Sequence, residues 1–104
     1  MNKMILPDSD EGKRLGFTSE KFSGWLWKIG NTIYISFIIS KHQRKGNFKK
    51  LIDSILDSGY TVKIPTPLGR MQCIVRKSGY KRTYEYDELM RENVEVWVLT
   101  KKKY

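Results

Sequence analysis

The segment from residue 32 to residue 64 is the part of the sequence that most limits the fold. Residues 32–40 (TIYISFIIS) predict a strand, and because both of its faces are nearly apolar we expect it at the centre of a sheet. Strict alternation places Ile33, Ile35, Phe37 and Ile39 on one face. An amphipathic helix follows, with apolar residues at helical spacing: Phe48, Leu51, Ile52, Ile55 and Leu56.

Gly59 can end this helix in the left-handed conformation, and residues 60–64 then predict a short strand. A strand, a helix and a second strand within about 30 residues are typical of a βαβ unit. The two strands should therefore be parallel, with a right-handed crossover between them.

The flanking segments complete a mixed sheet. Residues 25–29 and 32–40 form a hairpin around Gly30-Asn31, a pair that tolerates the positive φ of tight turns. A second helix is expected from Thr66 as its cap and Pro67 as its first residue to a stop at Gly79. Residues 81–86 and 94–100 close the chain as an antiparallel pair. The predicted class is α/β (α+β), in the order β-β-α-β-α-β-β.

The length of 104 residues predicts a single domain over residues 1–104. Residues 1–20 lack periodicity, so we expect a poorly structured N-terminal segment, with at most a short strand at residues 4–6. The folded core is expected over residues 24–101.

The charge balance points to an anionic partner. Twenty Lys and Arg against 11 Asp and Glu give a net charge of +9, which suits nucleic acid, a phosphorylated cofactor or an acidic protein surface. Part of the excess lies in the tail Lys101-Lys102-Lys103, a pattern more typical of a solvated end.

Other compositional features bear on metal binding, membrane insertion and cellular location. One cysteine and one histidine disfavour a transition-metal site, and we predict none. No apolar run approaches the roughly 20 residues that cross a bilayer. Without a signal-peptide pattern, the sequence favours a cytoplasmic location. The sequence does not determine the oligomeric state, and a dimer is compatible with it.

The basic stretch at residues 40–50 (SKHQRKGNFKK) contains five Lys or Arg between the central strand and the helix. The first turn of a helix has backbone N–H groups without intrahelical partners, at the positive end of the helix dipole. Gly46 permits close approach of a ligand to the backbone, and Gln43, Arg44 and Lys45 add donors and charge. This position predicts a phosphate or pyrophosphate site, with a nucleic-acid patch and a solvated turn as alternatives. Neither a Walker loop nor a GxGxxG motif occurs.

Gln43-x-x-Gly46-x-Phe48 resembles the Q/R-x-x-G-x-G/A signature with which GNAT N-acetyltransferases bind the pyrophosphate of acetyl-CoA. The second helix and its end (RMQCIVRKSGY, residues 70–80) and the last strand (EVWVLTK, residues 95–101) are also similar to that family. The likeness covers about residues 24–101 and is greatest to short, phage-type members, which would place the protein in the host cytoplasm.

The resemblance implies a cofactor and a site. Acetyl-CoA would lie where the two parallel strands splay apart, and its acyl group would pass to an amine on a protein, a nucleic acid or a small molecule. The residues implied in cofactor binding are Ile38, Ile39, Ser40, Gln43, Arg44, Lys45, Gly46, Asn47 and Phe48.

Two positions depart from the family pattern. Phe48 replaces a glycine or alanine, and we expect its side chain to point into the core. Val75 occupies the place of a tyrosine that many members use as general acid. Tyr80, Tyr84 or Tyr86 would therefore have to act as the acid. The amine acceptor also needs a base, for which Glu85, Asp87 and Glu88 near the last hairpin are the candidates. The alternative is a GNAT-fold binding protein without catalysis, which acts on a host protein or nucleic acid through its basic surface.

Overall fold

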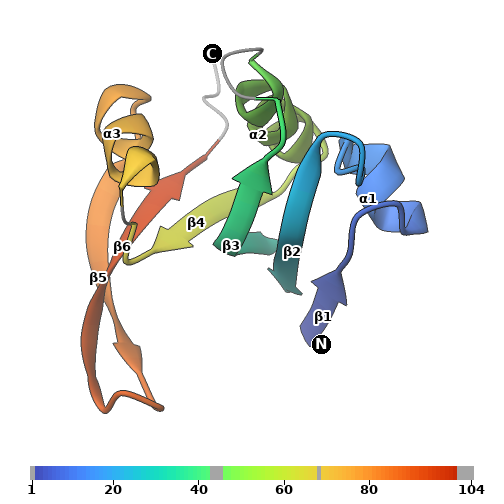
Figure 1. Ribbon diagram of the computed structural model, residues 1–104. Helices are drawn as coiled ribbons and strands as arrows, with labels where there is room; N and C mark the ends of the chain where they lie inside the picture. Colours follow the sequence, from blue (N-terminus) through green and yellow to red (C-terminus); the bar gives the residue numbers. More distant parts are fainter. Residues whose placement is uncertain (1, 43–45, 68, 101–104) are drawn as a thin grey trace.

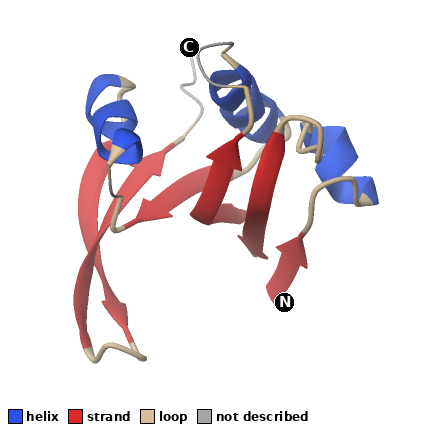
Figure 2. Ribbon diagram, viewed as in Figure 1, coloured by secondary structure: helices blue, strands red, loops and turns tan. Residues whose placement is uncertain are grey.

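The fold is described from a computed structural model, which describes residues 2–42, 46–67 and 69–100. Six strands form one sheet, accompanied by three helices (Figures 1 and 2). In chain order the elements are β1 (Asn2–Ile5), α1 (Asp10–Leu15), β2 (Phe22–Ile29), β3 (Thr32–Ser40), α2 (Asn47–Asp57), β4 (Thr61–Pro65), α3 (Arg70–Lys77), β5 (Lys81–Asp87) and β6 (Glu92–Leu99).

The sheet is mixed, as the sequence predicts. The spatial order is β1-β2-β3-β4-β6-β5, and β3–β4 is the parallel pair among otherwise antiparallel neighbours. The helix α2 connects β3 to β4, so the βαβ unit is confirmed. Strand β3 has a neighbour on each side, which agrees with its apolar sequence.

The N-terminal segment is more ordered than the sequence indicates. Strand β1 pairs with β2, and α1 is a helix that the prediction of a poorly structured segment missed. Ser9 caps α1 by accepting a hydrogen bond of 3.1 Å from the Gly12 N–H, and Leu15 is buried in the core. A helix of six residues is too short to produce a periodic apolar pattern, so local capping was its main signal.

The second predicted helix begins later than expected. Thr66 does not cap it: its φ is 41°, and its N–H donates a 2.7 Å hydrogen bond to the Glu95 carbonyl. That bond ties Thr66 to the neighbouring strand, so the cap position falls to Gly69 and α3 starts at Arg70. Gly79 follows α3 with a φ of 79°, as its sequence position predicts.

Strand β3 contains a bulge that changes the predicted faces. Trp25 pairs with Phe37 and Trp27 with Tyr34, so two steps along β2 correspond to three along β3. The extra residue reverses the alternation. Ile33 and Ile35 are buried, whereas Phe37 and Ile39 are about half exposed, so the single apolar face predicted for all four is wrong.

One core joins the sheet to its helices. It combines side chains of β2, β3 and β4 with those of α1 and α2, and Val75 brings in α3. Its fully buried members include Phe17, Phe22, Leu26, Ile33, Ile35, Leu51, Ile55, Val62, Ile64 and Val75. In the part of the chain described, no helix has the length and apolar character needed to cross a membrane.

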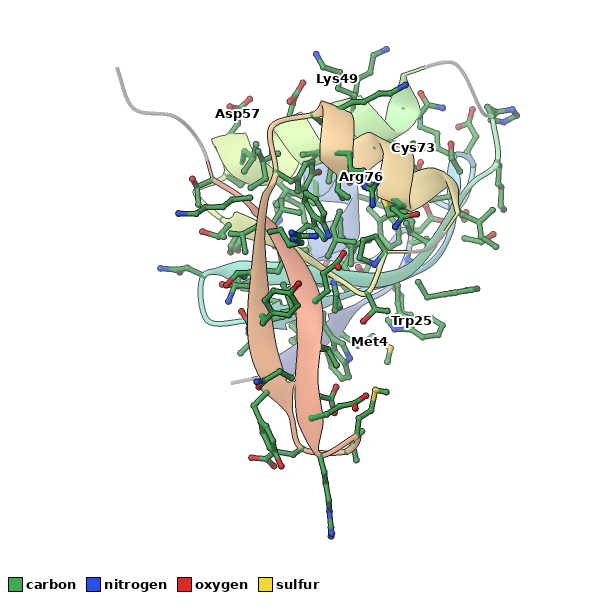
Figure 3. All side chains as sticks on the ribbon, turned by 90° about the vertical axis from the view of Figure 1, so that its left-hand side faces the viewer. Met4, Trp25, Lys49, Asp57, Cys73 and Arg76 are labelled. Atoms are coloured by element: carbon green, nitrogen blue, oxygen red, sulfur yellow. The ribbon has the colours of Figure 1, made fainter. Side chains whose placement is uncertain are left out.

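The opposite face of β1–β3 carries exposed apolar side chains, and Figure 3 shows Met4 and Trp25 together on one side of the molecule. Trp25 packs against Phe37 with ring centroids 5.0 Å apart. Trp27 and Ile39 are also exposed on these strands.

Candidate functional site

The parallel strands β3 and β4 separate partway along their length. They pair at Thr32–Thr61, Ile33–Val62 and Tyr34–Lys63, and the pairing stops there. Strand β3 nevertheless continues to Ser40 and β4 to Pro65. The carboxyl ends of the two central strands therefore leave an opening in the sheet, where ligands commonly bind in α/β folds.

A cavity of about 580 Å³ lies beside this opening. Its volume falls within the roughly 300–1,000 Å³ of typical ligand pockets. It lies between the end of β3, the first turns of α2, and α3. The lining residues are Ile38, Ile39, Ser40, His42, Gly46, Asn47, Phe48, Lys49, Ile52, Asp53, Met71, Ile74, Ser78, Tyr80 and Leu99.

The cavity brings together most of the residues that the sequence assigns to cofactor binding. Six of the nine line it: Ile38, Ile39, Ser40, Gly46, Asn47 and Phe48. The other three, Gln43, Arg44 and Lys45, lie outside the described residues.

The start of α2 forms one wall of the cavity. Gly46 occupies the cap position with a φ of 72°, a conformation that favours glycine, and a Cβ built there meets no atom within 4 Å. No side chain caps this helix and its first turn contains no acidic residue, among the residues described. The N–H groups of the first turn are therefore left to a ligand or water.

Among the described residues that line the cavity, Lys49 and Asp53 carry one positive and one negative charge. Lys49 is highly exposed and has only a loose contact of 3.9 Å with Asp53, one helical turn away. His42 is exposed and lines the same cavity. Figure 3 shows Lys49 on the α2 side of the molecule, with Arg76 and Cys73 on α3.

The side chain of Phe48 points toward the core, as the sequence predicts. Its side chain is half-buried and packs against the core, and it also forms part of the cavity wall. The ring leaves the space above Gly46 open.

Tyr80 is the one predicted catalytic candidate on the cavity wall. Its side chain is 8% exposed. Burial raises the pKa of its hydroxyl above the ordinary value, and the Asp53 carboxylate raises it further. The phenol thus stays protonated near neutral pH and can donate a hydrogen bond.

The other candidates lie elsewhere. Tyr84 is 59% exposed on β5 and does not line the cavity. Glu85 is also outside the cavity lining, and it accepts hydrogen bonds from Lys63 and, at 3.3 Å, from the Tyr34 hydroxyl. Val75 is completely buried in the core.

Sequence reasoning missed the α3 side of the cavity. Met71 and Ile74 of α3, and Leu99 of β6, are apolar residues whose spacing does not distinguish a cavity wall from a packed core. Asp53 could have been found from its spacing. It stands four residues after Lys49, so both side chains lie on the same side of α2 near its start.

A smaller hollow of about 170 Å³ adjoins the opening. It shares Ile38 and Met71 with the larger cavity. Its other walls come from both separated strands and the turn after β4: Ile35, Phe37, Ile64, Pro65, Thr66 and Pro67. Ile38 and Met71 therefore border both hollows, close to the point where β3 and β4 separate.

In comparisons with known proteins, no protein-family model matches the chain, and no curated protein matches it. The geometry of the cavity is therefore the basis for assigning a function.

Proposed function

We propose that this protein is an acetyl-CoA-dependent N-acetyltransferase of GNAT type, which binds its cofactor in the cavity between β3, α2 and α3. The observation that carries the proposal is the coincidence of three features. The pairing of the parallel strands stops at Tyr34–Lys63, an uncapped helix start faces the resulting opening, and a cavity joins the two.

The residues present suit the cofactor. The unpaired amides at the start of α2 would hold the pyrophosphate, and open space above Gly46 leaves room for it. The end of β3 would hydrogen-bond the pantetheine arm through the backbone of Ile38, Ile39 and Ser40. When bound, acetyl-CoA supplies the acyl thioester.

The chain's own polar groups would handle the protons. Tyr80 keeps a neutral hydroxyl inside the cavity, where it can donate a hydrogen bond to the sulfur that leaves. Asp53 is the one carboxylate among the described residues that line the cavity. The bulge in β3 lies beside the opening, and bulges are frequent next to active sites because they redirect backbone groups.

The acceptor amine would approach from the smaller hollow. This hollow shares Ile38 and Met71 with the cavity, so an acceptor there would lie beside the cofactor near the opening between the strands. The walls of the hollow are mostly apolar, and they give no basis for choosing among protein, nucleic-acid and small-molecule amines.

The second candidate function is binding without catalysis. It is favoured by the position of Glu85, whose carboxylate is engaged by Lys63, and by Val75 in place of the family's tyrosine. In this case the net charge of +9 would direct the protein to nucleic acid or an acidic host protein.

Titration calorimetry with CoA, acetyl-CoA and ATP tests the cofactor site. We expect CoA and acetyl-CoA to bind more tightly than ATP, which lacks the pantetheine arm. No binding of CoA at millimolar concentration would contradict the proposal.

A thiol-release assay with acetyl-CoA and a mixture of amines then separates the two functions. Release that depends on an amine supports the transferase. CoA binding with no release from any amine, together with DNA retention that falls steeply with salt, supports the binding protein.

A further inference from the structure

Strand β5 forms one edge of the sheet. It pairs with β6 on one side, and no strand of the described residues pairs with its other side. Figure 1 shows β5 and β6 as a long twisted arm that extends beyond the rest of the sheet. An edge of this kind presents a row of unpaired backbone N–H and C=O groups to other chains.

The sequence of β5 does not prevent pairing in the usual ways. Its seven residues (KRTYEYD) contain no proline, and their register with β6 is continuous from Lys81–Val98 to Asp87–Glu92. The strand is charged, and charge commonly keeps edges apart. Here, however, the charges are sorted by sign: Lys81 and Arg82 at the start, Glu85 and Asp87 at the end.

We propose that β5 pairs antiparallel with β5 of a second copy of this chain, about a two-fold axis at Tyr84. In this register Lys81 lies opposite the partner copy's residue 87, an aspartate. Arg82 lies opposite residue 86, a tyrosine, and Thr83 opposite residue 85, a glutamate. The symmetry makes each pair twice.

This register uses the strand fully and matches its chemistry. A two-fold axis through Tyr84 pairs all seven residues of β5, whereas an axis through Thr83 or Glu85 pairs five. The axis at Tyr84 also leaves Glu85 bonded to Lys63 within its own chain. Directly opposite charges stabilise cross-strand pairs, and Arg–Tyr contacts add cation–π attraction.

The side chains needed for the pairing are available. Lys81 is exposed and makes no ion pair within the described part of the chain. Arg82 is also exposed, although its guanidinium lies 6.0 Å from the centroid of the Trp97 ring in its own chain. Asp87 is already oriented, because its Oδ1 accepts hydrogen bonds from the N–H groups of Leu89 (2.9 Å) and Met90 (3.0 Å). Tyr84 and Tyr86 are 59% and 63% exposed, so both can gain contacts.

The turn between β5 and β6 adds apolar surface. Leu89 is 96% exposed and Met90 is 61% exposed. In the proposed register these residues extend past the start of the partner copy's β5, toward the position of Ser78 and Gly79 at the end of α3.

Charge reversal with sedimentation equilibrium tests this proposal. Lys81→Glu and Asp87→Lys each place like charges opposite one another, so each should weaken self-association roughly tenfold. The double variant, Lys81→Glu with Asp87→Lys, should restore it. An equimolar mixture of the two single variants should associate more strongly than either alone, because each then meets its opposite charge.

Lys13→Glu is the matched control, because it makes the same charge change on the exposed surface of α1. It should leave association unchanged, and circular dichroism should show every variant folded. Asp87 also accepts a hydrogen bond from the Leu89 N–H in the turn, so Asp87→Lys could alter the turn itself. In that case the Lys81→Glu variant and the mixture decide the test. The proposal is overturned if the wild-type chain stays monomeric to millimolar concentration, if Lys81→Glu behaves like Lys13→Glu, or if the folded mixture shows no gain.

Discussion

Lys63 on β4 donates a hydrogen bond to Glu85 on β5, although β6 lies between the two strands. The Tyr34 hydroxyl of β3 donates to the same carboxylate at 3.3 Å. The Glu85 hydrogen bond is the main reason that the pKa of Lys63 is raised. Glu85 thus links three strands on one side of the sheet, and we infer a structural rather than a catalytic role.

Replacing Glu85 with Gln tests that role. The change removes a partly buried charged hydrogen bond, so we expect about 1 kcal/mol lower free energy of unfolding by urea denaturation. CoA affinity measured by calorimetry should not change, because Glu85 does not line the cavity. Glu88→Gln, an exposed carboxylate in the nearby turn, is the control and should alter neither quantity. Loss of acyl transfer with unchanged stability would instead make Glu85 catalytic.

Gly46 and Gly59 provide a matched pair at the two ends of α2. Both have positive φ, 72° and 91°, and both have open space where a Cβ would stand. Leucine at either position should therefore cost a similar 1 kcal/mol or so of stability. Only Gly46→Leu should abolish CoA binding, because only Gly46 lines the cavity. Equal CoA affinity in the two variants, measured by calorimetry, would show that the cofactor does not bind there.

Tyr80 should make stability depend on pH in the alkaline range. Its pKa is raised in the folded protein, so its contribution is fully present below the ordinary value of about 10 and is lost as pH rises above it. At roughly pH 11 the loss should be about 1.4 kcal/mol relative to Tyr80→Phe. Urea denaturation from neutral to alkaline pH measures it. Tyr84→Phe is the control, since its exposed hydroxyl should give no such difference. A Tyr80→Phe profile parallel to the wild type would contradict the burial of this hydroxyl.

Glu11 should make stability depend on pH in the opposite direction, with a loss of stability in acid. Lys28 donates a hydrogen bond of 2.8 Å to it, and this contact together with Lys3 lowers the pKa of Glu11. The resulting stability is present above the ordinary value of about 4.3 and is lost as pH falls below it. We expect Glu11→Gln to lower the free energy of unfolding by about 1–2 kcal/mol at neutral pH and by less near pH 3. Exposed Glu20→Gln should have little effect, and an equal loss at both pH values would exclude the ion pair as the cause.

The long elements were readable from the sequence because their apolar patterns are periodic. The strand at residues 32–40 lies where its apolar run predicts it, and the helix lies where the spacing of Leu51, Ile52 and Ile55 predicts it. The basic stretch also led to the residues that meet at the cavity, since a glycine at a helix start has a definite backbone role.

Other features had no such pattern. Helix α1 depends on the Ser9 cap and on the contact between Glu11 and Lys28, which join residues that no periodicity connects. The bulge in β3 adds one residue without changing the hydropathy of the strand, so the exposure of Phe37 could not be predicted. The α3 wall of the cavity depends on where two helices meet in space, which sequence spacing does not encode.

The three residue pairs between β3 and β4 have a mechanical consequence. They join two half-sheets, β1-β2-β3 and β4-β6-β5. This seam between β3 and β4 has fewer paired residues than any other pair of neighbouring strands in the sheet. Beyond Tyr34 and Lys63 the halves are joined by the side chains of α2 and the core rather than by a backbone ladder. A molecule bound in the opening would touch both halves at once. It would hold the two half-sheets together, so amide hydrogen exchange along the seam should slow when it binds.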